Sequence, residues 1–105
     1  MIPLQHSRKV EWTHHAHDKM RYYKLSESRV RRILHSPKRI EEGIAPDTIA
    51  MMQPAGNEKN PYELWVMIQD KKDARLVISA WRYPGVTKVG EPLPPEILRE
   101  LRNFL

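Results

Sequence analysis

The sequence predicts an α+β domain in which two N-terminal helices precede an antiparallel sheet of three or four strands, and a C-terminal helix closes the fold. Two observations predict this arrangement. Apolar residues recur at helical spacing between about residues 13 and 35, whereas they alternate along segments rich in Val, Ile, Trp and Tyr between about 48 and 83. Because 105 residues supply one hydrophobic core, we expect a single domain over residues 1–105.

The first helix is expected from about residue 14 to 24, after a short strand over residues 9–12. Thr13 stands at the N-cap position, where a hydroxyl can accept a hydrogen bond from a main-chain N–H of the first turn. Ala16 and Met20 lie one helical turn apart, so they should form the buried side of this helix.

The second helix is expected over residues 27–35, with Ser26 as its N-cap. Leu25 and Val30 have the spacing of a hydrophobic staple, which fixes the direction in which the chain enters a helix. Pro37 disfavours the helical conformation at the residue before it, so the helix should end there.

The rest of the chain is predicted to form the sheet and the closing helix. The expected strands cover residues 39–44, 48–53, 62–69 and 74–83, and residues 70–73 make a hairpin loop. One face would carry Leu64, Val66, Ile68, Leu76, Ile78 and Ala80, and the other Trp65, Met67, Val77, Ser79, Trp81 and Tyr83. Because the second face is also apolar, we expect an amphipathic helix over about 95–105 to pack on it or on a partner.

The excess positive charge lies in the first half of the chain. Residues 1–45 hold ten Lys and Arg, five Asp and Glu and all five His, whereas residues 46–105 hold eight residues of each charge. This asymmetry is typical of a surface that meets a phosphate backbone. The alternative is a solvated basic surface of two helices without a ligand.

Composition excludes several classes of protein. There are no cysteines, so disulfides and thiolate metal sites are excluded and a reducing compartment is favoured. No run approaches the roughly 18 apolar residues of a membrane span, and the N-terminus lacks the apolar core of a signal peptide. We therefore expect a cytoplasmic protein that has no cofactor and is not inserted in a membrane.

His15, Lys19 and Tyr23 form a stripe at helical spacing and are the first candidates for chemistry. An imidazole can transfer a proton at neutral pH, and a neighbouring ammonium can hold a phosphate oxygen. RNA cleavage by its own 2′-hydroxyl needs a base, an acid and a cation, so we predict His15, Lys19 and Arg82 as the catalytic residues. The alternative for His15 is a structural role, in which its ring ties the helix to the sheet.

A metal site is an alternative interpretation of this segment, because His14 with His17, and His14 with Asp18, have helical spacings at which two side chains can bind one metal ion. We predict no metal site. No second group of ligands follows downstream, and Lys19 and Arg21 would repel a cation.

Further candidates for RNA binding lie in the second helix and at the end of the last strand. Arginine suits phosphate, and aromatic rings can stack on bases. The predicted RNA-binding residues are Tyr23, Arg31, Arg32, Lys38, Trp81 and Tyr83. The alternative is that Trp81 and Tyr83 belong to the core and that the basic residues are solvated.

The pattern Thr13-x-His15-Ala16-x-x-Lys19-Met20, followed by Leu25-Ser26 and Val30-x-x-Ile33-Leu34-x-x-Pro37, resembles the opening of a family of small bacterial and phage domains related to BrnT-like and RelE-like ribonuclease toxins. The resemblance covers about residues 10–85. It implies a toxin-like fold, a metal-independent endoribonuclease and an antitoxin protein as partner.

The chain departs from that family pattern at three positions. Lys19 stands where arginine is usual, Tyr23 replaces a second basic residue, and Lys24 replaces a glycine. These departures motivate an alternative function, a non-catalytic module that binds RNA or protein on the same fold. A third hypothesis is a structural domain that forms oligomers through its C-terminal helix.

Overall fold

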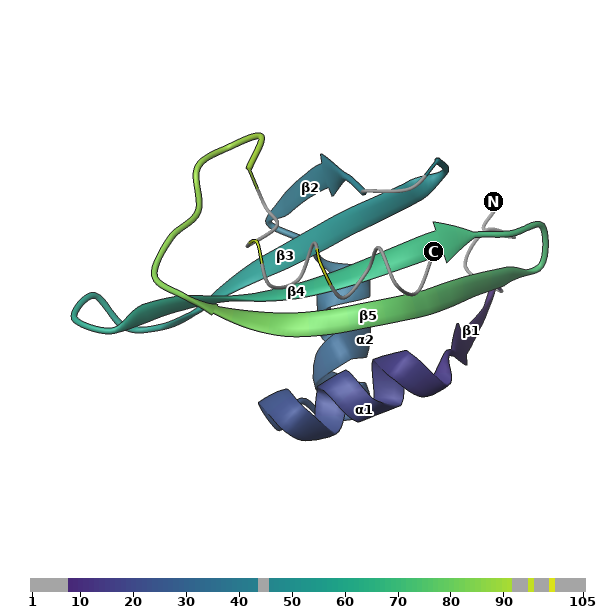
Figure 1. Cartoon of the computed structure of the whole chain (residues 1–105), viewed down its shortest axis with the longest axis horizontal. Helices are drawn as coiled ribbons and strands as arrows, with labels where there is room; N and C mark the ends of the chain where they lie inside the picture. The colour runs from purple at the N-terminus through teal and green to yellow at the C-terminus, as the bar shows by residue number, and fades with distance from the viewer. Residues whose placement is uncertain (1–7, 44–45, 92–94, 96–98, 100–105) are drawn as a thin grey trace.

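The computed structural model describes residues 8–43 and 46–91, together with the single residues 95 and 99. Two helices lie on one face of a five-stranded sheet whose strand order is β1-β5-β4-β3-β2 (Figure 1). The elements in chain order are β1 (Lys9–Trp12), α1 (His14–Tyr23), α2 (Glu27–His35), β2 (Arg39–Glu42), β3 (Thr48–Gly56), β4 (Pro61–Asp70) and β5 (Ala74–Pro84).

The predicted sheet of three or four antiparallel strands was wrong. The sheet has five strands and is mixed, because β1 pairs in parallel with β5, from Lys9 opposite Ala74 to Trp12 opposite Val77. The remaining pairs, β5 with β4, β4 with β3 and β3 with β2, are antiparallel. A local pattern of residues cannot reveal that a four-residue segment joins a strand more than 60 positions later.

The first helix forms where its cap and apolar spacing predict it. Thr13 accepts a hydrogen bond of 2.9 Å from the main-chain N–H of Ala16, and its hydroxyl donates one of 3.0 Å to the carbonyl oxygen of Ile78. The cap therefore also fastens α1 to β5. At the other end Lys24 has φ 58°, a left-handed conformation that reverses the chain toward α2.

The second helix and its cap were also predicted correctly. Ser26 accepts a hydrogen bond of 3.1 Å from the main-chain N–H of Arg29. Leu25 and Val30, the two residues of the expected staple, are both buried in the core. In this way α2 is held against β3 and β4, while α1 packs on β5.

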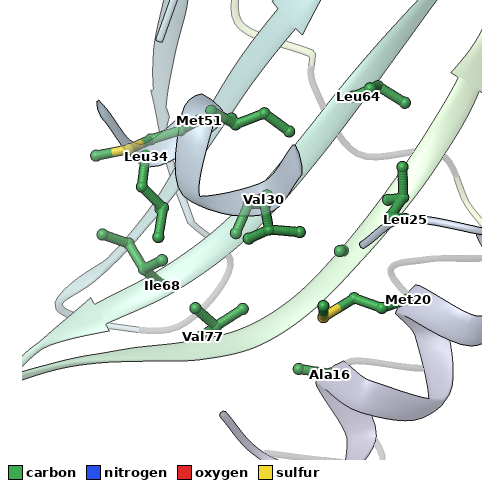
Figure 2. Packing of buried hydrophobic residues seen from close by; sticks show 12 residues of the cluster. Ala16, Met20, Leu25, Val30, Leu34, Met51, Leu64, Ile68 and Val77 are labelled. Carbon is green, nitrogen blue, oxygen red and sulfur yellow. The ribbon is translucent and has the colours of Figure 1, made fainter. Parts of the chain in front are cut away.

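The main core lies between the helices and the sheet (Figure 2). Ala16 and Met20 come from α1, and Val30, Ile33 and Leu34 come from α2. They pack against the sheet residues Met51, Leu64, Val66, Ile68, Val77 and Ala80. Burial of this apolar surface is the main force that holds the helical layer on the sheet.

The opposite face of the sheet carries a second apolar cluster, made of Ala50, Met52, Trp65, Met67, Ile78 and Trp81. The prediction placed Ile78 on the helix side and Val77 opposite it, and the structure reverses both. An irregularity in the β4–β5 pairing between Met67 and Ile68 shifts the register, so that Ile68 faces Val77. Leu76 likewise packs against the second cluster and not against the helices.

The predicted closing helix over 95–105 lies almost wholly outside the described residues, and the last element that the structure describes is a strand, β5. The elements that the structure describes in full are two helices and five strands, so the described part of the chain is mainly sheet, and of the predicted closing helix only residues 95 and 99 are described, both in helical conformation. Neither α1 nor α2 is long and apolar enough to cross a membrane.

A buried polar network fixes the segment that follows β5. The carboxylate of Glu63, which is only 2% exposed, accepts hydrogen bonds from Trp65 Nε1 at 3.0 Å and from Thr87 Oγ1 at 2.6 Å. Arg39 donates to the carbonyl oxygen of Thr87 at 3.1 Å and to Glu41 at 3.0 Å. These contacts hold the chain after β5 against β2 and β4, beside the second cluster.

Candidate nucleic-acid interface

The predicted stripe on α1 runs along β5. His15, Lys19 and Tyr23 are each half-buried, as expected for positions that flank the buried Ala16 and Met20. Helical spacing makes His15 a neighbour of Lys19, and Lys19 a neighbour of Tyr23. The helix thus presents an imidazole, an ammonium and a phenol in a row.

Arg82 meets the C-terminal end of this row. Its Nη2 donates a hydrogen bond of 3.0 Å to the main-chain carbonyl oxygen of Tyr23, and its guanidinium lies 4.8 Å from the centre of the Tyr62 ring. The Arg82 side chain is exposed. It therefore offers a fixed positive charge to solvent at the point where β5 passes the end of α1.

The three predicted catalytic residues share one side of the molecule, but they do not meet at one phosphate. Residues 15 and 23 are eight positions apart, which corresponds to about 12 Å along the helix axis. Arg82 is anchored at Tyr23, so it lies two turns from His15. The Nε2 atom of His15 is in addition buried.

A cluster of tyrosines surrounds Arg82 and Lys19. Tyr22 is 73% exposed, and its ring meets the ring of Tyr23 edge-on, with 4.8 Å between the ring centres. Lys19 Nζ lies 5.4 Å from the centre of the Tyr22 ring. We call Lys19, Tyr22, Tyr23, Tyr62 and Arg82 the tyrosine cluster.

The helical layer, residues 14–35, carries most of the net charge. It contains six Lys and Arg against only Asp18 and Glu27, which gives +4 of the +5 of the whole chain, and it also holds four His. Asp18 forms an ion pair with Arg21 at 2.6 Å, and a carboxylate oxygen of Glu27 lies 3.4 Å from His17 Nε2. The negative charge of Asp18 is thus partly screened from a ligand.

The predicted phosphate-binding residues of α2 and the following turn are accessible. Arg31, Arg32 and Lys38 are all exposed, and no described carboxylate forms an ion pair with any of them. The Arg31 guanidinium lies 5.5 Å from the Trp12 ring, which in turn stacks on His17 at 5.7 Å. These ring contacts hold Arg31 at the surface of the layer.

Two of the predicted RNA-binding residues lie elsewhere. Trp81 is 0% exposed and stacks on Trp65 in the second cluster, with 5.9 Å between the ring centres, so it is not available to stack on a base. Tyr83 packs against the same cluster. The proposed role of Trp81 is corrected: successive strand residues point to opposite faces, and Arg82 faces the helices.

The structure also has a shallow hollow of about 640 Å³, lined by Asp47, Thr48, Ile49, Gln69, Asp70 and Lys71. None of the predicted site residues lines it. Arg82 lies seven residues from Arg75, the β5 residue that pairs with Asp70, which is more than 20 Å along a strand. In the residues that the structure describes, no group of three His, Asp or Glu is placed to hold a metal ion.

The sequence reasoning missed Tyr22, Tyr62 and the network around Glu63. The exposure of Tyr22 could be predicted from the sequence. Tyr22 follows the buried Met20 by two positions, which is about 200° of helical rotation, so its side chain must point away from the core. Tyr62 was not, since its contact with Arg82 depends on the pairing of β4 with β5.

Comparisons with protein-family models, with curated proteins and with solved structures gave no match.

Proposed function

We propose that this chain binds RNA through the exposed surface of its helical layer. The observation that carries the proposal is the charge of that layer: a net +4 within 22 residues on one face of the sheet, where Asp18, one of its two acids, forms an ion pair with Arg21. Such a surface attracts a phosphate backbone and releases its counterions.

The proposed phosphate contacts are Arg31, Arg32 and Lys38 on α2 and its following turn, and Lys19 and Arg82 beside α1. All but Lys19 are exposed, and Lys19 is half-buried. Arginine is suited to this role because its planar fork can donate two hydrogen bonds to one phosphate. The resemblance to ribonuclease toxins favours RNA as the polyanion. It also implies an antitoxin as partner, and an acidic antitoxin would compete with RNA for the same layer.

A charge-reversal experiment tests the proposal. The double variant Arg31→Glu, Arg32→Glu should bind a fluorescent single-stranded RNA at least tenfold more weakly than the wild type. The matched control is Lys71→Glu, Lys72→Glu, which makes the same change of charge in the exposed β4–β5 loop. If both double variants lose affinity equally, net charge alone is responsible and the proposed surface is wrong.

A second candidate function is metal-independent RNA cleavage, which His15 and Lys19 favour because they are one turn apart beside β5. In such a reaction the 2′-oxygen attacks the phosphorus, the 5′-oxygen leaves, and a 2′,3′-cyclic phosphate forms. Because its Nε2 is buried, His15 would have to act through Nδ1, which would take the proton of the 2′-hydroxyl and then give it to the leaving 5′-oxygen, while Lys19 would stabilise the charged phosphorane. Arg82, two turns away, would hold a neighbouring phosphate and not the one that is cleaved.

Cleavage is tested with His15→Ala, with His14→Ala as the control in the preceding, exposed position. The second candidate predicts that the wild type and His14→Ala produce RNA with a cyclic phosphate end and that His15→Ala does not. If the wild type binds RNA and leaves it intact, the chain is a binding module and the first proposal stands alone.

A further inference from the structure

The tyrosine cluster has a feature that phosphate binding alone does not require. Tyr22 is 73% exposed, so the fold does not gain the stabilisation that burial of this large ring would give. The aromatic neighbours Tyr23 and Tyr62 are largely buried. Tyr22 is thus the ring of this cluster that a ligand can reach.

One cation of the cluster lies over that ring, and the other is fixed at the next residue of the chain. Lys19 Nζ lies 5.4 Å from the centre of the Tyr22 ring, and the Tyr23 ring closes one edge. Arg82 is fixed to the carbonyl oxygen of Tyr23, the next residue along the chain, and rests on the Tyr62 ring. The accessible Tyr22 ring therefore has one positive charge over it, from α1, and a second, from β5, bonded to the main chain of the next residue.

This is the arrangement that a nucleotide requires. A base can stack on a tyrosine ring, and its flanking phosphates can be held by a lysine and an arginine. In a duplex each base is already stacked between its neighbours and is not accessible to a side chain. An unpaired base can turn out of the strand and stack on protein.

We infer that the tyrosine cluster binds an unpaired nucleotide, so that the RNA recognised by this chain is single-stranded. The base stacks on Tyr22, and Lys19 and Arg82 hold the phosphates on either side. The inference rests on the RNA binding proposed above and adds the class of RNA and the residue that selects it.

The test compares a single-stranded oligouridylate with a double-stranded RNA of the same length, for the wild type and three variants. Tyr22→Ala should weaken binding of the single strand by roughly 5- to 100-fold, the range expected when one base loses its stacking partner. Binding of the duplex should change less than twofold. Tyr22→Phe, which keeps the ring, should bind the single strand as the wild type does.

Val86→Ala is the control for trimming an exposed apolar side chain elsewhere, since Val86 is 70% exposed. It should bind both RNAs unchanged. The inference is overturned if Tyr22→Ala binds the single strand as well as the wild type does, or if it loses both RNAs alike. In either case the charge-reversal result can still support the helical layer, whereas a wild type that binds neither RNA contradicts the proposed function as well.

Discussion

Arg82 Nη2 donates a hydrogen bond of 3.0 Å to the main-chain carbonyl oxygen of Tyr23, 59 residues earlier in the chain. This carbonyl belongs to the last turn of α1, where main-chain oxygens have no partner within the helix. The contact therefore completes the end of α1, joins it to β5, and holds the guanidinium at the surface.

Arg82→Lys should lower the free energy of unfolding by about 1 kcal/mol, although the charge is kept. An ammonium cannot donate to the Tyr23 carbonyl oxygen and also lie flat on the Tyr62 ring. Chemical denaturation measures the change, and Arg29→Lys serves as the control because, among the residues that the structure describes, none forms a hydrogen bond with the Arg29 side chain. Equal stability of Arg82→Lys and wild type would mean that the contact contributes nothing.

Lys24→Gly should stabilise the protein by about 1 kcal/mol, because residue 24 has φ 58° and side chains other than glycine are strained there. The relevant comparison is with Lys24→Ala, which removes the same charge but keeps the strain. Thermal or urea denaturation should place Lys24→Gly above both Lys24→Ala and the wild type. A Lys24→Gly protein no more stable than Lys24→Ala would argue against the left-handed cap.

Glu63→Gln should destabilise the fold by about 3 kcal/mol. The carboxylate is 2% exposed and accepts hydrogen bonds on both of its oxygens, from Trp65 and the Thr87 hydroxyl on one and from the Thr87 main-chain N–H on the other. An amide has a single acceptor oxygen, so a buried donor loses its partner, whereas Arg39 keeps its ion pair with Glu41. Glu42→Gln, at an exposed position of β2, should change stability by less than about 0.5 kcal/mol. Similar unfolding curves for the two variants would show that the network does not hold the segment after β5.

Stability should fall at acid pH in part through Asp70. Two hydrogen bonds from Arg75, at 2.7 and 2.9 Å, hold the pKa of the Asp70 carboxyl below its usual value, with a smaller contribution from Arg8. A lowered pKa in the folded state stabilises the protein above the unfolded pKa of about 4 and ceases to do so as the pH falls through the folded pKa.

Asp70→Asn should therefore lose about 1 kcal/mol at neutral pH and show a shallower loss of stability below about pH 4. The expected loss of stability is small because a quarter of the Asp70 side chain is exposed, so water screens its ion pair with Arg75. Urea unfolding at a series of pH values measures this, with Asp73→Asn, in the exposed loop, as the control. An Asp70→Asn protein with the acid profile of the wild type would contradict the role of the pair.

Local signals in the sequence were sufficient to predict both helices. Thr13 and Ser26 act as caps through main-chain groups three residues away, so their role can be recognised without the rest of the fold. The family pattern that the sequence resembles has a glycine where this chain has Lys24. The backbone at this position has the left-handed conformation that glycine adopts without strain.

The pairing of the strands and the position of Arg82 depend on contacts between residues far apart in the sequence, so local patterns could not predict them. The parallel pairing of β1 with β5 and the irregularity at Met67 and Ile68 are not encoded in any alternating pattern, so the facing of Val77 and Ile78 was predicted wrongly. The stripe of His15, Lys19 and Tyr23 was visible from helical spacing. The position of Arg82 at the Tyr23 end of that stripe, far from His15, was not.

The salt dependence of RNA affinity tests the central claim most directly, because it counts the phosphates that the helical layer neutralises. With Lys19, Arg31, Arg32, Lys38 and Arg82 engaged, the logarithm of the association constant for single-stranded RNA should fall with the logarithm of salt concentration at a slope of about −3.5, and at about −2 in Arg31→Glu, Arg32→Glu. A slope near zero, or one that this double variant leaves unchanged, would contradict an RNA-binding helical layer.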